Sequence, residues 1–568
     1  MTSEQTGNGA PRRIRWEHEL LPVVLLAVCM VVSAAIVLNL TSKLTFITDE
    51  WSFLVLRQGW GLDQLLTPFG GHPVMTPAFI FKFSQELFGM DSSRPEQFVA
   101  TAIFLLTNAL LFIYLRRRVG SWAALIGTAL ILFLGGAFEA LLWSFQTMVY
   151  IGAMAAGIGA LIALDRDDHK GDVIAAILLA LSLTFSGIGL TFVAAAIVEW
   201  ALNPRDRRRR IFVPLVPLTF FVLWWLGWGH STSADSFEPS LELSVLPKVP
   251  EYMFNAFAAG LTSLGGLATG DGSEPDQPHL IWGKLAAIVL IGLSIWRIRS
   301  LGRVPRDFLV TAAAGLCLYL MFALAQDAYQ AFGVAQVRTP TLSRYQLPSA
   351  IFILLIASTL LRGVKIPRLA LVIAGVLSLF AITNGIQLMT DKAHERWEPS
   401  SAYSKATLTG IEAAGPDMVA GYSFKLGTPF ELPGDQYMRA VEAHGSPAYS
   451  QEELASMDPA FRGTADSALI GALGIEVSGA PPAFDSPQCR RVNVKRSLAL
   501  EPGTYSVKNR GETDLYFGLA RLGDPPGLPI GGALPGATVG LGLPAGSLDA
   551  PWVLSFSGTG PAQICSDR

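Results

Sequence analysis

The sequence predicts a polytopic α-helical membrane protein that ends in an extracytoplasmic α+β domain containing a small β-sandwich. The first reason is composition: 51% of the 568 residues are hydrophobic and 15% are charged, whereas soluble domains carry about 25% charged residues. The second reason is a series of long apolar runs that recur up to about residue 390. The third is the polar sequence, rich in Pro and Gly, that replaces those runs from about Asp391 onwards.

About eleven segments have the length and composition of a membrane-spanning helix. They cover residues 20–41, 97–115, 121–139, 146–164, 173–187, 188–202, 211–229, 281–298, 308–326, 346–361 and 369–389. The first segment follows a cluster of arginines and lacks the small-residue cleavage site of a signal peptide. Arginine and lysine concentrate in every second short loop. By the positive-inside rule we predict a multi-pass plasma membrane protein with a cytoplasmic N-terminus and an extracytoplasmic C-terminal domain.

Two stretches within this series admit alternatives. Residues 173–202 form either one long helix or a hairpin of two short helices broken at "FSGIG". One helix would place the arginines at 207–210 outside, so we predict the hairpin, with its tip near Ser186 and Gly187. The apolar, Gly-rich stretch of residues 252–270 is interpreted as an outer-surface or re-entrant helix, because a span there would invert every later segment.

The predicted domains are a transmembrane domain over residues 1–390 and an extracytoplasmic domain over residues 391–568. In the second domain, helical periodicity over residues 450–474 precedes short alternating segments joined by turns, which predicts helices followed by a small β-sandwich. Cys489 and Cys565 lie in this domain. Outside the cytoplasm, two such cysteines favour a disulfide over two unpaired thiols.

The loop of residues 42–97 is the most informative of the predicted outer segments. Its stretches "WSFLVLRQGWGLDQLLTPF" and "GGHPVMTPAFIFKFSQELFG" have helical apolar periodicity. They predict two helices that lie along the outer membrane surface. Asp49 and Glu50 precede the first helix, and His72 precedes the second. Because a helix dipole favours carboxylates at its N-terminus, the acidic pair also has a purely structural explanation.

This order of a first span, an acidic pair and two surface helices resembles the GT-C superfamily of integral-membrane glycosyltransferases. Asp49 and Glu50 in "ITDEWSFL" match the superfamily pattern, and "SRYQLPSAIFIL", which starts at Ser343, is similar to the Arg-Tyr-x-x-Pro opening of a late span. Over residues 15–390 the layout is similar to that of protein mannosyltransferases, aminoarabinose transferases and actinobacterial arabinofuranosyltransferases. The resemblance implies that a sugar moves from a polyprenyl-phosphate donor to an extracytoplasmic cell-envelope acceptor, which is a glycan, a lipid or a protein.

Such a transfer needs a base for the acceptor hydroxyl, positive charge for the departing phosphate and an apolar groove for the polyprenyl chain. The catalytic candidates are Asp49 and Glu50. We assign the base to Asp49, because neighbouring side chains do not share a face, which leaves Glu50 to orient a partner or cap the helix. Arg338 and the pair Arg344 and Tyr345 are candidates for binding the phosphate. A snorkelling Arg beside an aromatic belt is the structural alternative.

Four further residues are substrate-binding candidates. Glu139, in an apolar run at the outer end of a span, would act as a second acid, a metal ligand or an orienting group. His72 would bind a sugar hydroxyl, a phosphate or a metal ion. Trp143 and Gln146 would stack on and hydrogen-bond to a sugar ring. The structural alternatives are an exposed loop carboxylate, a satisfied loop histidine and an aromatic belt.

The sequence contains no strong metal, Walker, dinucleotide or nucleophile-elbow motif, so no cofactor is predicted and only a divalent cation is left open. The short basic runs are topological anchors, and nucleic acid is not an expected partner. Two other functions compete: a transporter or flippase for a lipid-linked saccharide, and a non-catalytic scaffold for envelope assembly. The spans are nearly free of charge and show no clear repeat, which argues against transport.

Overall fold

The structure is a computed structural model of the chain. It describes residues 13–204, 207–231, 243–269, 280–325, 338–428, 430–493 and 496–566. The predicted outer segments 230–280 and 327–344 lie partly outside the described residues. Contacts divide the chain into two compact units. The first holds Met1–Ser42, Gly59–Phe81 and Arg94–Glu395, and the second holds Lys43–Gln58, Lys82–Ser93 and Arg396–Arg568.

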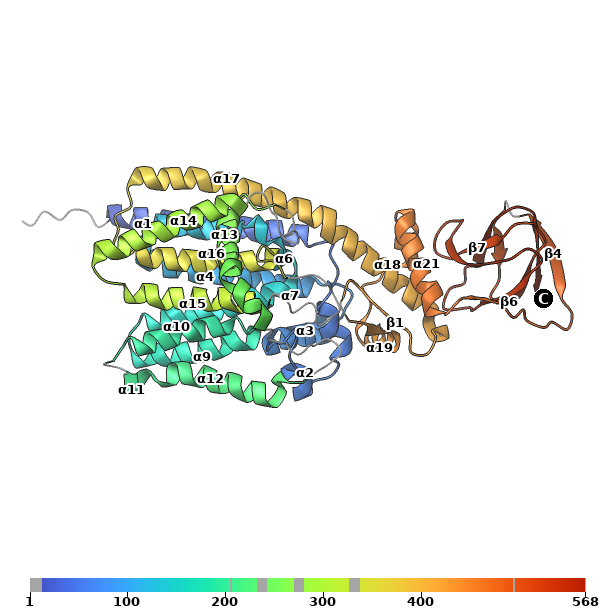
Figure 1. The fold of residues 1–568 in the computed structure, drawn as a ribbon, viewed down its shortest axis with the longest axis horizontal. Helices are drawn as coiled ribbons and strands as arrows, with labels where there is room; N and C mark the ends of the chain where they lie inside the picture. The colour runs from blue at the N-terminus through green and yellow to red at the C-terminus, as the bar shows by residue number, and fades with distance from the viewer. Residues whose placement is uncertain are drawn as a thin grey trace, which may run out of the picture. The chain divides into compact units, whose positions relative to one another are not determined.

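The first unit is a bundle in which the long helices run side by side (Figure 1). Its helices are α1 (Arg13–Leu40), α2 (Leu62–Leu66), α4 (Arg94–Val119), α5 (Ser121–Leu132), η2 (Gly135–Ala137), α6 (Phe138–Leu142), α7 (Ser144–Gln146), η3 (Thr147–Gly152), α8 (Ala153–Leu164), α9 (His169–Phe185), α10 (Gly189–Ala201), α11 (Arg207–Arg210), α12 (Phe212–Trp224), η4 (Trp225–Gly229), η5 (Leu243–Lys248), α13 (Val249–Leu264), α14 (Leu280–Leu301), α15 (Arg306–Leu324), α16 (Ser343–Leu360) and α17 (Arg368–Lys392). The helix α3 (Met75–Phe88) is divided between the units after Phe81. Each predicted span coincides with helical residues.

Among the described residues, seven helices are long and apolar enough to cross a membrane, and the bent pair Ser121–Leu132 and Gly135–Leu142 makes an eighth if it counts as one span. Three predicted spans are not in this set. Two of them are short, with 17 residues in α9 and 13 in α10. The third, α16, lies at the centre of the bundle and packs against α4, α13 and α15. Because it faces protein, it tolerates the polar residues that lower its hydropathy.

Helices at the rim of the bundle differ from α16 in what they expose. The surfaces of α1, α14 and α17 carry exposed leucines, isoleucines and valines. Such an apolar surface suits contact with lipid chains. The stretch of residues 252–270 corresponds to α13, which packs on α14, α15 and α16. Its 16 residues reach about 24 Å, short of the roughly 30 Å of a bilayer core.

The stretch of residues 173–202 is the predicted hairpin. The helix α9 ends at Phe185 and α10 begins at Gly189. Arg210 forms ion pairs with Asp172 near the start of α9, at 3.2 Å, and with Glu199 near the end of α10, at 3.4 Å. The two helices therefore return the chain to the end of the bundle from which it came.

The second unit joins two segments of the 42–97 loop to the C-terminal part of the chain. Its helical elements are η1 (Ser52–Leu56), α18 (Glu398–Ala414), η8 (Gly415–Asp417), α19 (Gly434–His444), α20 (Gln451–Ala455) and α21 (Pro459–Ala472), and β1 (Ser423–Phe424) pairs with β2 (Leu432–Pro433). The turn η7 (Ala393–Trp397) is divided between the units after Glu395. The first predicted surface helix is wrong as one element. It is the π-helical turn η1 and the short α2, separated near Gly59, whose φ of 81° turns the chain. The second predicted helix is α3.

The C-terminal strands form the predicted β-sandwich. They are β3 (Val477–Ser478), β4 (Gln488–Asn493), β5 (Leu498–Leu500), β6 (Gly503–Asn509), β7 (Leu515–Ala520), β8 (Leu528–Ala533), β9 (Thr538–Leu543), β10 (Trp552–Ser557) and β11 (Pro561–Ser566). The two sheets have the orders β5-β10-β7-β8 and β3-β9-β6-β11-β4, and their inward apolar residues form one core. The predicted disulfide is confirmed: Cys489 of β4 lies opposite Cys565 of β11, with a Cα–Cα distance of 4.1 Å.

Candidate functional site

Five of the predicted binding residues gather in the first unit, near the start of α16. We call His72, Glu139, Arg338, Arg344 and Tyr345 the polar cluster. Electrostatic interactions connect its members: Arg338 acts on His72. Two tyrosines that the sequence did not single out also belong to this neighbourhood, because Tyr150 and Tyr252 both interact with Arg338 and Arg344. Tyr150 also interacts with Glu139.

The start of α16 holds this cluster together through backbone and ring contacts. The backbone N–H of Glu139 donates to the hydroxyl oxygen of Ser343 at 3.1 Å, which ties α6 to α16. The Tyr252 hydroxyl donates to the carbonyl oxygen of Arg338 at 3.0 Å. The ring of Tyr345 stacks on Phe322 at 4.1 Å between centroids. Contacts from α6, α13 and α15 therefore hold the backbone of Arg338 and the two residues that flank Arg344.

His72 occupies a tight turn that faces the hairpin tip. Its backbone and that of Phe69 exchange two hydrogen bonds, of 3.0 and 2.9 Å, across two glycines with positive φ. The position where a Cβ of Gly187 would lie is 2.9 Å from His72 Nδ1, so the missing side chain at Gly187 allows this approach. Burial, assisted by the charge of Arg338, lowers the pKa of His72 to about 4. The imidazole is therefore neutral at pH 7 and is a hydrogen-bonding group there, not a cation.

Trp143 and Gln146 do not lie on an exposed outer surface. Both side chains are buried, and the ring of Trp143 lies 6.5 Å from that of Phe145, between centroids. Phe145 in turn contacts Phe69 edge-on at 5.2 Å, so this aromatic group supports the turn that holds His72. Trp143 is thus not a residue of an exposed aromatic belt. The Gln146 Oε1 atom is buried and has no hydrogen-bond partner among the described residues.

A small residue brings two further polar atoms together beside α16. A Cβ on Gly136 would lie 2.4 Å from both Gln346 Oε1 and Ser263 Oγ. These two oxygens are buried and lack a hydrogen-bond partner within the described part of the chain. Buried polar groups are normally paired.

The acidic pair belongs to the second unit, and its two members have different surroundings. Glu50 is 1% exposed, and its Oε2 accepts the backbone N–H of Ile47 at 2.8 Å. It therefore closes its own turn, in which Thr48 has a φ of 37°. Asp49 is only partly buried. Of the two, Asp49 is the more accessible carboxylate.

Two cations of the same loop were missed by the sequence analysis. Arg57 is 3% exposed and lies 5.0 Å from the ring centroid of Phe53. Lys82 is 4% exposed and its ammonium donates to the carbonyl oxygen of Arg57. Burial, together with the charge of Arg57, lowers the pKa of Lys82 to about 8. The amphipathic pattern of the loop assigned both residues to a membrane surface, and no local signal distinguishes a buried Lys from a snorkelling one.

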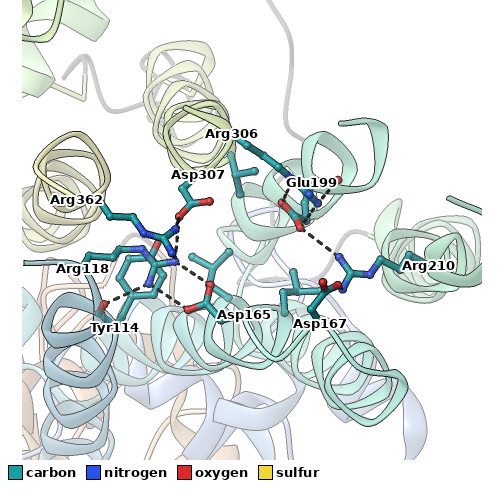
Figure 2. A pocket seen from close by; sticks show the side chains of 12 residues that line it. Tyr114, Arg118, Asp165, Asp167, Glu199, Arg210, Arg306, Asp307 and Arg362 are labelled. Carbon is teal, nitrogen blue, oxygen red and sulfur yellow. Dashed lines mark hydrogen bonds and ion pairs between the residues drawn. The ribbon is translucent and has the colours of Figure 1, made fainter. Parts of the chain in front are cut away.

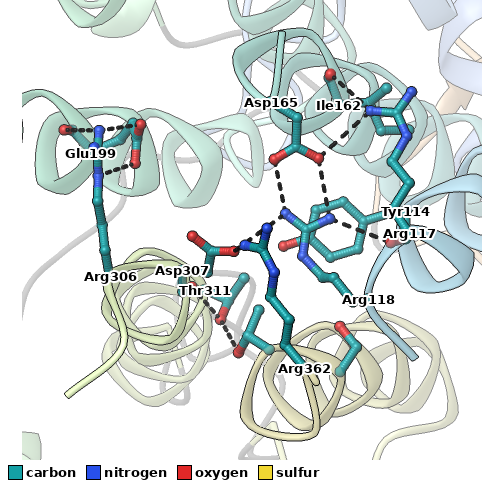
Figure 3. Close-up of polar contacts among 12 residues, drawn as sticks. Tyr114, Arg117, Arg118, Ile162, Asp165, Glu199, Arg306, Asp307, Thr311 and Arg362 are labelled. Carbon is teal, nitrogen blue, oxygen red and sulfur yellow. Dashed lines mark hydrogen bonds and ion pairs between the residues drawn. The ribbon is translucent and has the colours of Figure 1, made fainter. Parts of the chain in front are cut away.

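The other end of the bundle contains a charged cavity of about 230 Å³ (Figure 2). Its charged lining consists of Arg118, Asp165, Asp167, Glu199, Arg210, Arg306, Asp307 and Arg362. Arg118 is held most firmly. Its guanidinium donates to both carboxylate oxygens of Asp165, at 3.1 and 2.9 Å, and lies 3.6 Å from the ring centroid of Tyr114. Figure 3 shows this pair beside the ion pair of Arg362 with Asp307.

The cavity lining is electrically balanced, since four arginines face four carboxylates. Burying charges is costly unless they are paired, and here each named arginine has a carboxylate partner. The five loops predicted to lie on one side of the membrane supply nearly all of these residues. That these residues meet in one cavity supports the prediction that the loops lie on the same side of the membrane. Because no excess charge remains to hold an ion, the ion pairs of the cavity serve to join the helix ends.

A resident metal ion does not fit the donor groups of the described residues. Within the described ranges, no group of three or more His, Cys, Asp or Glu side chains is placed so that it could hold a metal ion. The polar cluster supplies one carboxylate and one histidine beside two arginines.

Solved structures that resemble this chain include two kinds of protein. One is the Archaeoglobus fulgidus oligosaccharyltransferase, in a complex with Zn and sulfate: 15% identity, TM-score 0.38, covering 68% of this chain and 55% of that one. The same archaeal protein, AglB, in complex with an inhibitory peptide and a dolichol-phosphate, shares 14% identity at a TM-score of 0.38, with coverages of 75% and 60%. The other is ArnT from Cupriavidus metallidurans bound to undecaprenyl phosphate: 13% identity, TM-score 0.35, coverages of 73% and 84%.

At such identities and TM-scores these likenesses carry no argument about the family, the site residues or the reaction. The chain spans little more than half of the length of the oligosaccharyltransferase that it matches. No protein-family profile and no curated protein matches the sequence.

Proposed function

We propose that this protein is a membrane glycosyltransferase that moves a sugar from a polyprenyl-phosphate donor to an extracytoplasmic cell-envelope acceptor. The polar cluster is the observation that carries the proposal. It combines two arginines, one carboxylate and a neutral histidine at one end of a helix bundle. Two guanidinium groups that both act on Tyr150 and Tyr252 suit the binding of an anionic phosphodiester.

The contrast between the two ends of the bundle supports this assignment. At the charged cavity, arginines and carboxylates balance, and several of the pairs are bidentate or buried. At the polar cluster, the charged side chains that act on Tyr150 are the arginines Arg338 and Arg344 and the carboxylate Glu139. Guanidinium groups bind phosphate oxygens with two parallel hydrogen bonds. The phosphate of the donor is accordingly assigned to Arg338 and Arg344.

The chemistry then follows from the charges that must be moved. The acceptor hydroxyl oxygen attacks the anomeric carbon of the donor sugar, and the bond from that carbon to the phosphate oxygen breaks. The electron pair leaves with the polyprenyl phosphate, whose growing charge the two arginines stabilise. The hydroxyl proton passes to Asp49, which we assign as the general base because Glu50 is buried and bonded to its own turn. A divalent cation is not required by this scheme.

Transport of a lipid-linked saccharide fits the structure less well. A path through the bundle would have to open the end that carries the charged cavity. There, Arg118 and Arg210 are almost fully buried and joined to several helices. Breaking such pairs is costly, because it leaves buried charges uncompensated. The orientation with the N-terminus in the cytoplasm and the sugar chemistry outside remains part of the proposal.

Binding of undecaprenyl phosphate, the kind of lipid released in the reaction, tests the role of the polar cluster. We expect Arg344→Gln to weaken its binding to the protein in nanodiscs by about tenfold, because a charge-assisted contact is lost. Native mass spectrometry gives the bound fraction. The matched control is Arg362→Gln, which alters an exposed arginine at the opposite end of the same bundle. Equal binding by wild type and Arg344→Gln, or an equal loss in the control, would contradict the assignment.

A further inference from the structure

The β-sandwich of the second unit has a groove of about 1000 Å³ at one open end. Strands β4, β6 and β11 of one sheet and β5 of the other contribute to it. Its lining includes Phe484, Gln488, Arg490, Glu501, Tyr505 and Ser566. The proposed transfer chemistry uses none of these side chains.

Three of these side chains form a row across the sheet. Gln488 of β4 pairs with Ser566 of β11, and Ser566 pairs with Tyr505 of β6. Residues directly opposite each other on neighbouring strands point to the same face, about 4.8 Å apart. The row therefore runs about 10 Å from an aromatic ring to an amide, with a hydroxyl between them. This length accommodates more than one sugar ring.

Tyr505 is a fixed platform within the row. Its hydroxyl donates to the carbonyl oxygen of Glu501 at 2.7 Å, and its ring packs against the sandwich core while it also lines the groove. A Cβ on Gly503 would lie 3.8 Å from the ring. Because that position carries no side chain, nothing from it covers the ring. An aromatic face held in this way binds a flat apolar surface without losing side-chain freedom.

The groove is also rigid on its other sides. Phe484 lies in a segment that contains Pro482. A Cβ on Gly540 of β9 would lie 2.9 Å from the carbonyl oxygen of Ala480 and 3.2 Å from Pro482 Cδ, so this segment lies directly against β9. The disulfide joins β4 to β11 beneath the row. A preformed groove reduces the entropy that a ligand loses on binding.

The charges in the groove select the kind of ligand. Arg490 and Glu501 both act electrostatically on Tyr505, and their charges cancel. A polyanion such as a nucleic acid would meet no net positive charge here. A sugar has C–H faces for an aromatic ring and hydroxyls for amide, guanidinium and carboxylate groups. We propose that this groove binds an uncharged oligosaccharide. Together with the proposed function, on which this step rests, the proposal makes a neutral envelope glycan the class of acceptor.

Direct binding to the full-length protein in nanodiscs tests this proposal. The probes are linear neutral hexasaccharides of glucose, mannose, galactose and arabinose, together with a sulfated hexasaccharide, and no donor lipid is present. We expect at least one neutral probe to bind. Tyr505→Ala should weaken its binding by about tenfold, and Gln488→Ala should also weaken it. Tyr505→Phe keeps the ring and is expected to retain binding. Titration calorimetry measures the affinities.

The control variant is Tyr516→Ala, which removes another tyrosine, 57% exposed, from the opposite sheet. It is expected to bind as wild type does. The proposal is overturned if no neutral probe binds, if the sulfated probe binds more tightly than all of them, or if Tyr516→Ala loses as much affinity as Tyr505→Ala. Free-thiol titration shows whether each variant has formed the disulfide and hence folded. Since the donor is absent, failure of sugar transfer and failure of groove binding are separate results.

Discussion

At the scale of single residues, the acidic pair shows how neighbours acquire different roles. Glu50 is buried and accepts the N–H of Ile47, three residues back. Asp49 keeps part of its surface accessible. A base must reach the proton of its acceptor, so in the proposed reaction accessibility favours Asp49 over Glu50. The sequence alone predicted that only one of the two carboxylates would act on the substrate. The hydrogen bond at Glu50 supports Asp49 as that residue.

The low pKa of His72 predicts an acid-sensitive fold. The unfolded histidine takes up its proton near pH 6.5, whereas the folded one does so near pH 4. Between these values the unfolded chain binds more protons, so stability that is present above pH 6.5 is lost as the pH falls towards 4. We expect wild type to lose about 2 kcal/mol more than His72→Gln between pH 7 and pH 5. Denaturant unfolding in detergent at both pH values measures this difference.

The comparison with His72→Gln removes the effect of carboxylates, which titrate in both proteins. His394→Gln is the matched control, because His394 is exposed. It is expected to lose the same stability as wild type over this range. If His72→Gln does so as well, the histidine is not buried in the neutral form.

At the scale of elements, the hairpin of α9 and α10 brings Gly187 against His72. The approach of 2.9 Å at the position of the absent Cβ leaves no room for a methyl group unless the imidazole moves. We expect Gly187→Ala to lower the rate of sugar transfer by about tenfold while the protein still folds, because small displacements of binding groups are costly for catalysis. The transfer assay on purified protein provides the rate.

Gly292→Ala on α14 is the control for this substitution. A Cβ on Gly292 meets nothing within 4 Å, and alanine is the better helix former. Full activity in both variants would show that the position of His72 does not matter for transfer.

At the same scale, Arg210, which lines the charged cavity, also pairs with a buried carboxylate outside that lining, and this pair predicts a large stability effect. Asp172 is fully buried and pairs with Arg209 and Arg210, both at 3.2 Å. We expect Asp172→Asn to destabilise the protein by about 3 kcal/mol, because it leaves buried positive charge poorly compensated. Thermal unfolding in detergent reports the change.

Asp168→Asn is the control here. Asp168 is exposed, pairs with the exposed Arg166 and caps α9 by accepting the N–H of Gly171. Asparagine caps a helix equally well, and exposed ion pairs contribute little. A loss of stability as large as that of Asp172→Asn would mean that burial is not the cause.

At the scale of the whole molecule, the sequence predicts architecture better than partners. Hydropathy and the spacing of arginines predicted the helices and the hairpin at Gly187, since both follow from how a chain enters a bilayer. Two cysteines predicted the disulfide. The arginines at 207–210 were read as anchors only, yet Arg210 pairs with Asp172 and Glu199. Such pairs depend on which helices become neighbours, which local sequence does not encode.

The same limit applies to the candidate site. The sequence named His72, Glu139, Arg338 and Arg344 separately, from their position at span ends. Their association depends on the turn at Phe69 and on the bonds at the start of α16. Tyr252 was missed for this reason: it lies on α13, whose place in the bundle no periodicity indicates.

Consumption of the lipid donor by the reconstituted protein tests the central claim most directly. Purified protein in nanodiscs is mixed with polyprenyl-phosphate sugars and a cell-envelope glycan fraction, and mass spectrometry follows each lipid. We expect wild type to convert one species to polyprenyl phosphate and Asp49→Asn to do so about 10²–10⁴-fold more slowly. Glu50→Gln should remain active, because its amide oxygen still accepts the N–H of Ile47. No conversion of any species by wild type, or undiminished conversion by Asp49→Asn, would contradict the account.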